Sequence, residues 1–135
     1  MANDLLPAAR SAFARGEISW TGDDFLAILL DSATYDDTWQ YRDDLTAAEL
    51  ATAALAGTVV RDGGICDADD TTVTGLGIGD TARALVIVRD TGSGATSEVV
   101  YFADQNDDTT PISVVGDGSA VVLRWSDSAT AVFQL

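Results

Sequence analysis

Short apolar segments of strand length recur along the chain, and they constrain its fold more than any other feature. The clearest are residues 24–31, 82–89 and 97–103, which are separated by segments rich in Asp, Gly and Thr. No apolar run approaches the roughly 20 residues that a membrane-spanning helix needs. Short strands at intervals of about 8–12 residues are typical of antiparallel sandwiches and barrels. The sequence therefore predicts a mainly β fold, either an antiparallel β-sandwich or a jelly-roll-like barrel.

Turn residues between the segments predict which strands are neighbours. The sequence TGSGA at residues 91–95 predicts a hairpin between the second and third of these segments. Gly116-Asp117-Gly118 predicts another hairpin, between residues 112–115 and 120–125. The other expected strands are residues 51–61, 71–74 and 130–135, with turns, loops or a short helical turn at 34–45, 62–64 and 75–80.

One helix is expected, over about residues 4–15 of a single domain that spans residues 1–135. Asn3 or Asp4 can cap its N-terminus, and Pro7 falls in the first turn, where its missing N–H is harmless. Gly16 is expected to end the helix. Apolar residues recur at helical spacing along one side, at Leu6, Ala9 and Phe13.

The ionisable residues exclude several kinds of catalytic site. All 7 basic residues are Arg, and the chain has neither Lys nor His. The usual catalytic triads, His metal sites, Schiff-base chemistry and a P-loop are therefore excluded. The serines have no neighbouring base to activate them, so we expect no catalytic residue and no enzyme activity. The single Cys66 excludes an intrachain disulfide and a cysteine-rich zinc site, and we expect it in the core.

Asp67, Asp69 and Asp70 are the candidate ligands for a metal ion. Ca²⁺ prefers several oxygen atoms close together, as such a loop offers. The segment lacks the spacing and the final Glu of an EF-hand, and acidic residues are so frequent here that clusters arise by chance. The alternative is a solvated β-turn. We therefore expect no cofactor and no bound metal, with calcium as the alternative.

The net charge narrows the set of partners. At −15, the chain repels a phosphate backbone, so we expect no nucleic-acid partner. Strong acidity also keeps free subunits soluble and apart until they meet a matching surface. The N-terminal residues lack a basic segment followed by an apolar stretch, so we expect no secretory signal and no membrane partner.

Two segments carry the candidate interface residues. The helix presents an apolar stripe that either packs on the domain or docks on another subunit. The polar loop 34–45 combines aromatic residues with an Arg, and these residue types are enriched at interface hot spots. The alternative for the loop is that its aromatic rings cover one end of the sandwich. The candidates are Leu6, Arg10, Phe13, Tyr35, Trp39, Tyr41 and Arg42.

Four motifs follow one another along nearly the whole chain. The expected helix ends at Gly16 and is followed by an aromatic strand entry at Trp20. An Asp-Ala-Asp-Asp segment lies at residues 67–70, an Arg-Asp-Thr-Gly hairpin at 89–97, and a terminal strand that starts from Trp at 125–135. In this order, the chain resembles the small structural proteins encoded in the head and tail gene blocks of tailed bacteriophages.

This resemblance implies a virion structural protein, and we expect a capsid decoration (cement) protein that binds and stabilises the outer shell. Its expected partners are the major capsid protein and copies of itself, as a homo-oligomer. Its expected location is the capsid exterior, after synthesis in the host cytoplasm, where a charge of −15 lies away from packaged DNA. Two alternatives stay open: a tail-tip, neck or fibre-associated protein involved in adsorption, and a calcium-dependent binding module.

Overall fold

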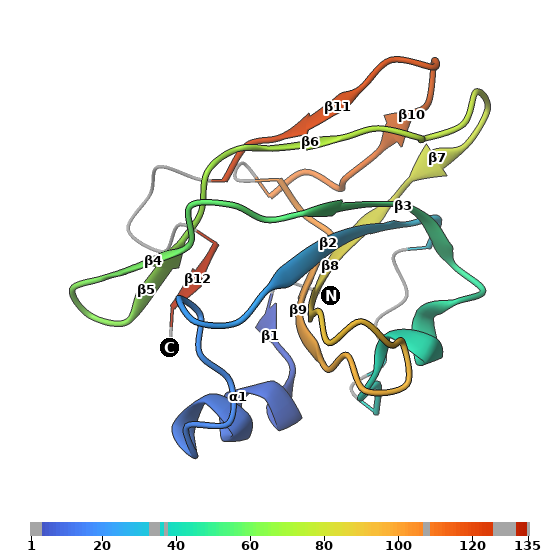
Figure 1. Ribbon diagram of the computed structural model, residues 1–135. Helices are drawn as coiled ribbons and strands as arrows, with labels where there is room; N and C mark the ends of the chain where they lie inside the picture. The colour runs from blue at the N-terminus through green and yellow to red at the C-terminus, as the bar shows by residue number, and fades with distance from the viewer. Residues whose placement is uncertain (1–3, 33–35, 37, 107–108, 126–131, 135) are drawn as a thin grey trace.

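A central sheet of five antiparallel strands organises the computed structural model of this chain (Figure 1). The structure describes residues 4–32, 36, 38–106, 109–125 and 132–134. The strands of the sheet follow the order β1-β9-β8-β2-β3. Their bounds are β1 Asp4–Leu5, β2 Phe25–Leu30, β3 Glu49–Ala54, β8 Ala84–Arg89 and β9 Val99–Ala103.

The inner strands of this sheet are apolar along almost their whole length. β2 reads FLAILL and β8 reads ALVIVR, without the alternation of polar and apolar residues that marks a strand with one wet face. Successive side chains of a strand point to opposite faces of its sheet, so such a run is stable only where both faces are covered. Every residue of β9 is buried, as this argument requires.

Neighbouring aromatic residues on β9 show how the two faces are covered. The ring of Tyr101 packs against Phe133 at a centroid distance of 5.4 Å. The next residue, Phe102, faces the other way and packs against Trp39 at 6.1 Å. Trp20 adds to the first face, because its ring lies 5.0 Å from that of Phe133. Phe133 of the C-terminal strand therefore covers part of one face, and Trp39 covers part of the other.

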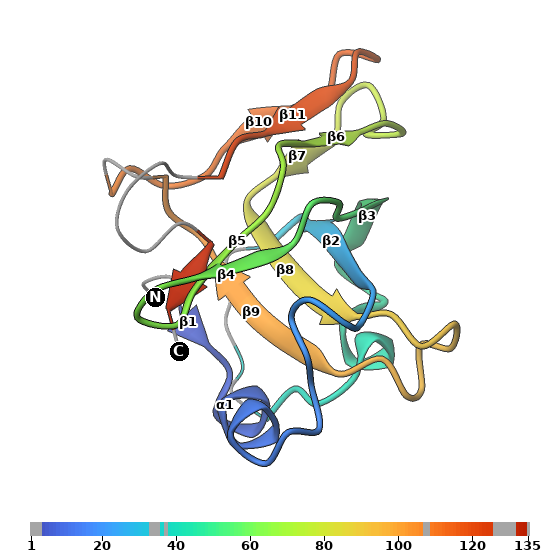
Figure 2. The same ribbon diagram turned by 60° about the vertical axis from the view of Figure 1, so that its left-hand side comes forward.

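Three small antiparallel sheets surround the central one. They have the orders β12-β5-β4, β11-β6 and β10-β7. The last two stand together above the central strands in Figure 2. The bounds of their strands are β4 Val59–Arg61, β5 Ile65–Asp67, β6 Thr71–Val73, β7 Thr81–Ala82, β10 Val114–Val115, β11 Val121–Leu123 and β12 Phe133–Gln134.

The helix α1 (Pro7–Ala14) begins later than its predicted first residue. Asp4 and Leu5 form β1 instead, paired with β9, and they anchor the chain to the edge of the central sheet. The N-cap is therefore Leu6, which makes no side-chain cap, and the predicted cap by Asp4 is wrong. The expected place of Pro7 in the first turn is confirmed. Gly16 follows the helix with φ 75°, which a helix C-terminus favours.

The predicted strand at residues 51–61 is two strands that belong to different sheets. β3 ends at Ala54 in the central sheet, and β4 begins at Val59 in the sheet with β5. Gly57 lies between them with φ 65°, a backbone conformation that breaks a strand. β5 itself was missed, because Ile65-Cys66-Asp67 is short and directly follows a turn signal. The turn at residues 62–64 is confirmed as the β4–β5 hairpin.

One predicted hairpin is right and the other is wrong. β8 pairs with β9 across residues 91–95, as expected. Residues 114–115 and 121–123 do not pair with each other, although Gly116-Asp117-Gly118 joins them. Instead β10 pairs with β7, and β11 pairs with β6. The connection from β6 to β7 therefore lies beside the connection from β10 to β11. Residues 116–118 reverse the direction of the chain, but the strands on either side of them do not pair with each other.

The predicted class is confirmed: the protein is mainly β, with a five-stranded antiparallel sheet and one short N-terminal helix, consistent with a β-sandwich. A continuous cluster of buried apolar residues runs from the helix through the central sheet to β6, β7 and β12. A 3₁₀ turn, η1 (Arg42–Leu45), contributes the fully buried Leu45 to this cluster.

Candidate functional site

Four short strands and their connections form a projection that we call the arm, residues 71–82 and 114–123. β6 and β11 form one half of the arm, and β7 and β10 form the other half (Figure 1). Along β6, Thr71 and Val73 are buried and Thr72 is exposed, so one face of the arm packs against the body and the other faces solvent. This alternation is absent from the central strands.

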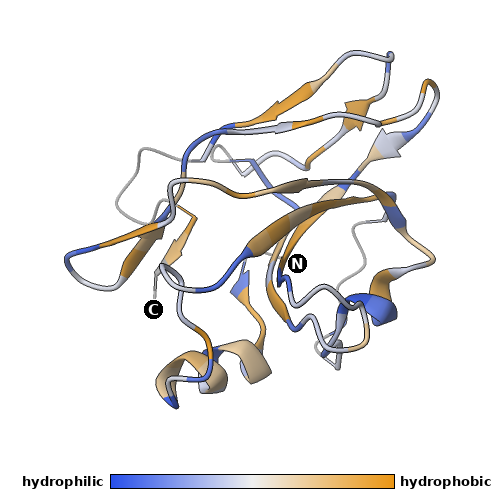
Figure 3. Cartoon of the chain, in the orientation of Figure 1, coloured by the Kyte–Doolittle hydropathy of each residue, from blue (hydrophilic) through white to orange (hydrophobic). Residues whose placement is uncertain are grey.

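The solvent face of the arm carries apolar side chains. Val115 on β10 is 65% exposed and Val122 on β11 is 48% exposed. Val122 lies opposite Thr72 in the β11–β6 ladder, which places both on the outer face. Figure 3 shows that β10 and β11 are as apolar in sequence as the buried strands β2 and β8. The arm therefore has more apolar surface than its contact with the body buries.

The tip of the arm holds a single isoleucine in solvent. Ile78 is 83% exposed, more than any other large apolar residue that the structure describes. It lies in a four-residue turn that closes where the Asp80 N–H donates to the Gly77 carbonyl at 3.1 Å. Gly79 has φ 90° at the third position, as a type II turn requires. A turn of this kind points its second side chain, here Ile78, away from the chain.

A second turn fixes the first one in place. The Gly116 N–H donates to the Asp80 carbonyl at 2.7 Å, and the Gly79 N–H donates to the Gly116 carbonyl at 3.3 Å. The backbones approach so closely that a Cβ at position 116 would overlap the Gly77 carbonyl oxygen. The Ile78 side chain also lies beside Gly118. Ile78 is therefore held by a rigid pair of turns rather than by a free loop.

The tip is acidic around this isoleucine. The Asp80 carboxylate lies beside Gly77, within the same turn. In the second turn, the Asp117 Oδ1 accepts a hydrogen bond from the Ser119 N–H at 2.9 Å. This hydrogen bond holds the pKa of Asp117 below its usual value, so the carboxylate stays charged. The tip is thus an apolar side chain flanked by two carboxylates.

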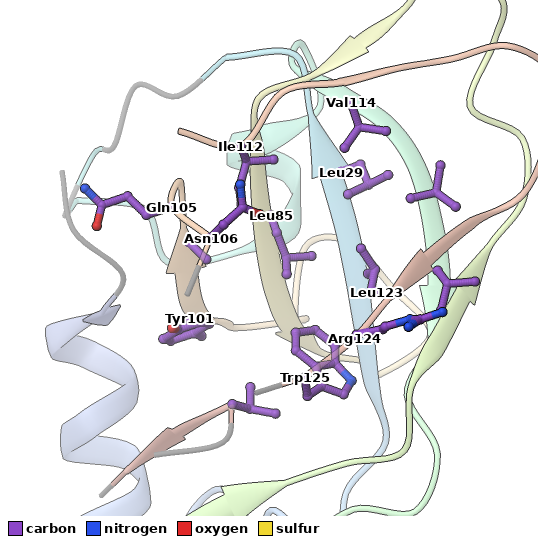
Figure 4. Close-up of a pocket in the computed structure, with 14 residues that line it drawn as sticks. Leu29, Leu85, Tyr101, Gln105, Asn106, Ile112, Val114, Leu123, Arg124 and Trp125 are labelled. Carbon is purple, nitrogen blue, oxygen red and sulfur yellow. The ribbon is translucent and has the colours of Figure 1, made fainter. Parts of the chain in front are cut away.

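A cavity of about 310 Å³ lies between the arm and the central sheet (Figure 4). Leu29 and Leu85 line it from the sheet, where they are direct neighbours in the β2–β8 ladder. Val114 and Leu123 line it from the arm, and Trp125 closes one end. The remaining lining residues are Tyr101, Ala103, Gln105, Asn106, Ile112, Val121, Val122, Arg124 and Val132.

Arg124 is the cation at the edge of this cavity. Five of the other arginines form ion pairs, at Arg10, Arg15, Arg42, Arg61 and Arg89. Among the residues that the structure describes, Arg83 and Arg124 have no acidic partner. In a chain with a net charge of −15, an exposed guanidinium without a carboxylate is unusual. It gives the cavity a positive edge in an otherwise negative molecule.

The β4–β5 hairpin presents a second apolar surface, at the left of Figure 1. Val59 and Val60 are 48% and 49% exposed, and they lie on the edge strand of the sheet β12-β5-β4. Arg61 at the end of the strand lies 3.8 Å from Asp67 on the paired strand. An edge strand with exposed β-branched residues is a surface on which another chain can pack.

The interface residues predicted on the helix have mostly structural roles. Leu6 is fully buried, so its prediction as an interface residue is wrong: the stripe of the helix packs on the body. Phe13 is half-buried, with its ring 5.9 Å from that of Phe133. Arg10 is exposed and pairs with Asp4 at 3.1 Å.

The predicted loop candidates divide in the same way. Tyr35 lies outside the described residues. Trp39 packs on Phe102, while Tyr41 is 38% exposed. Arg42 makes two hydrogen bonds to Glu49, which raise the pKa of its guanidinium. The structure brings Tyr41 and Arg42 together at η1, away from the arm.

Sequence reasoning missed the exposed valines and Ile78. A signal for Ile78 exists, because a large apolar residue inside Gly77-Ile78-Gly79-Asp80 stands where turns normally carry polar side chains. No comparable signal marks Val115 or Val122, since exposed and buried valines look alike in sequence. Their exposure follows only from the pairing of β10 with β7 and of β11 with β6.

The three candidate metal ligands do not gather around one point. Asp67 pairs with Arg61, and its Oδ1 accepts a hydrogen bond from the Ala68 N–H at 2.9 Å. The Asp69 carboxylate packs against Gly57 instead. Within the described residues, no group of three or more His, Cys, Asp or Glu side chains is placed to hold a metal ion.

Comparisons with known proteins give no family for this chain. No protein-family model, no curated protein and no solved structure matches it. Among the described residues, no helix has the length and apolar character to cross a membrane.

Proposed function

We propose that this protein is a structural component of a bacteriophage virion, and specifically a decoration protein that binds the outer surface of the capsid. One observation carries the proposal: the arm and the β4–β5 hairpin present apolar side chains to solvent. Val59, Val60, Ile78, Val115 and Val122 are each about half exposed or more. Exposed apolar side chains that gather on the surface are typical of protein interaction sites.

The charge of the chain supports the same role. Free subunits at −15 repel one another and stay soluble despite their exposed valines. On the outside of a shell the negative charge faces solvent. It lies far from the packaged nucleic acid, whose phosphates would repel it. The resemblance of the motifs to phage structural proteins adds the kind of particle to which such a subunit would bind.

The β4–β5 hairpin is the surface that we assign to the shell. Its valines lie at an open strand edge, where a neighbouring protein can add backbone hydrogen bonds as well as apolar contact. The paired Arg61 and Asp67 are at the same hairpin, so apolar contact there is bordered by charge of both signs. The major capsid protein is the partner expected on this surface.

The decisive experiment is the composition of purified virions. This chain is quantified against the major capsid protein by mass spectrometry. A ratio near one, or a simple fraction of it, supports the decoration role. A few copies per particle place the protein at the neck or tail instead, and its absence overturns the virion role altogether.

A binding assay then tests the assigned surface. Shells that lack the protein are mixed with the purified chain and sedimented. The double variant Val59→Ser, Val60→Ser should bind at least tenfold more weakly, because each face of the edge strand loses one half-exposed apolar side chain beside the partner that adds to this edge. Val115→Ser is the matched control, because it removes one exposed valine from the arm. Equal loss in both variants would contradict the assignment.

A further inference from the structure

An exposed isoleucine and an apolar cavity lie on different surfaces of the same chain. Ile78 is 83% exposed at the tip of the arm, and the cavity lies between the arm and the central sheet. The role proposed above for the β4–β5 hairpin uses neither of them. Each has the character of one half of a contact: a projecting apolar side chain and a hollow lined by leucine, valine and tryptophan.

We infer that Ile78 of one copy of the chain inserts into the cavity beside Trp125 of a second copy, so that the copies associate head to tail. This inference deepens the proposed role, because it specifies how copies of a decoration protein meet. It concerns the purified protein in solution, so it is tested without any capsid.

The sizes of the two parts match. An engineered cavity of about 150 Å³ in another protein is large enough to bind benzene. The cavity here measures about 310 Å³, so it has room for a branched aliphatic side chain and part of the turn that holds it. Its lining by Leu29, Leu85 and Leu123 offers the apolar surface that an isoleucine needs.

The charges of the two parts are also complementary. Asp80 and Asp117 flank Ile78 at the tip. Arg124 lies at the edge of the cavity, with no acidic partner among the residues that the structure describes. When the isoleucine enters the cavity, a tip carboxylate comes near this guanidinium, which can bind a carboxylate through two hydrogen bonds. The one cation of the cavity thus favours the acidic tip in a chain that otherwise repels itself.

The tip is already ordered in the shape that binds. Hydrogen bonds of Gly116 to both sides of the turn hold Ile78 in place, so little conformational entropy is lost when it docks. A flexible loop with the same sequence would lose much of the benefit of burying one side chain. The glycines at positions 77, 79, 116 and 118 make this close packing of two turns sterically feasible.

The geometry of such a contact sets the form of the assembly. The tip and the cavity are different patches, so the contact is heterologous, and its repetition gives a closed ring or an open chain. One inserted side chain with its surroundings buries less than the surface of a stable dimer, so each contact is weak on its own. Copies held side by side on a shell would make the same contact far more often.

The test is sedimentation velocity on the purified chain of residues 1–135 over about 1 μM to 1 mM. Concentration-dependent association is expected for the wild type. Ile78→Ser should weaken it about tenfold or more, because the inserted side chain is lost. Arg124→Glu should weaken it too, and added salt should reduce the difference between this variant and the wild type. Val60→Ser is the matched control and should associate like the wild type.

Mixing the two defective variants identifies the head-to-tail geometry. Ile78→Ser keeps an intact cavity, and Arg124→Glu keeps an intact tip. Their mixture should therefore form a one-to-one pair that grows no further, although each variant alone associates more weakly than the wild type. A symmetric contact between two tips or two cavities would not give this result.

Three outcomes would overturn the inference. The wild type stays monomeric over the whole range, or Ile78→Ser associates as the wild type does, or native mass spectrometry finds a small molecule bound in the cavity. None of them bears on the virion composition. A chain that associates in solution but is missing from virions would overturn the proposed function and leave this contact standing.

Discussion

The central sheet and the arm are both made of short antiparallel strands rich in valine, yet they bury these strands differently. In β8 and β9 the apolar residues are buried on both faces, and Val86, Val88 and Val100 have essentially no exposure. In the arm, one face of β11 packs inward while Val122 faces solvent. The difference indicates that the central sheet buries its apolar side chains within the chain, whereas the arm keeps an apolar face exposed that another molecule can cover.

The largest expected effect is in the central sheet. Phe102→Ala removes a fully buried ring of β9 that packs against Trp39, and it should lower the free energy of unfolding by about 3–5 kcal/mol. Ile78→Ala, at the tip of the arm, should change it by less than about 0.5 kcal/mol. Urea unfolding followed by tryptophan fluorescence measures both. Similar losses in the two variants would remove the distinction between sheet and arm.

A smaller effect is expected where the two turns of the arm meet. Gly116→Ala places a Cβ against the Gly77 carbonyl oxygen and close to Leu76, and it should cost about 1–3 kcal/mol. The damage should be local, because the overlap lies at the tip. Hydrogen exchange should become faster at the amides of Gly79 and Gly116 and stay unchanged in β8 and β9.

Thr74→Ala is the control for this prediction, because Thr74 is an exposed residue of the same arm. It should leave the exchange of the tip amides unchanged. Faster exchange throughout the central sheet of the Gly116→Ala variant would mean that the arm and the sheet unfold as one unit.

The third prediction concerns pH and the buried thiol of β5. Burial raises the pKa of Cys66 to about 11. In the unfolded chain the thiol loses its proton near pH 9, so between these values the folded state binds more protons than the unfolded state. The contribution of Cys66 to the free energy of unfolding is therefore fully present below pH 9. It falls as pH rises toward 11, by roughly 1.4 kcal/mol per pH unit.

Cys66→Ala provides the reference for that measurement. The variant has no thiol, so the part of the alkaline loss that comes from Cys66 should vanish from its profile, whatever its stability at neutral pH. Urea unfolding at pH 8, 9 and 10 measures both chains. Parallel profiles would show that the thiol ionises equally easily in both states.

The sequence predicts the sheet better than the arm, for a physical reason. A continuous apolar run such as β8 is stable only between two covered faces, so its place in the centre follows from the residues themselves. The β8–β9 hairpin follows from the turn residues that join two neighbouring strands of the chain. The arm depends on pairing between segments far apart in the chain, β6 with β11 and β7 with β10, and local turn signals do not encode such pairing.

The candidate site was predicted least well, because its residues are of ordinary types. The predicted candidates were charged and aromatic, and the structure gives Leu6 and Trp39 packing roles. Ile78 and the valines of the arm become candidates only once their exposure is known. The cavity joins residues from the sheet, the arm and the chain after β9, and no single segment of the sequence indicates it.

The smallest expected effect distinguishes the two faces of the arm itself. Val122→Thr replaces a methyl group with a hydroxyl on the outer face, where water can hydrogen-bond to it, and should change the free energy of unfolding by less than about 0.5 kcal/mol. Val73→Thr makes the same change on the inner face of the paired strand, where the side chain is fully buried, and should cost about 1–3 kcal/mol. Both variants alter a residue of the β6–β11 ladder, so backbone pairing and β-propensity are matched. Thermal unfolding of the two variants at low protein concentration measures the difference without self-association. Equal costs would mean that the outer face of the arm is already covered within the monomer, and its valines would then have no surface left for a partner.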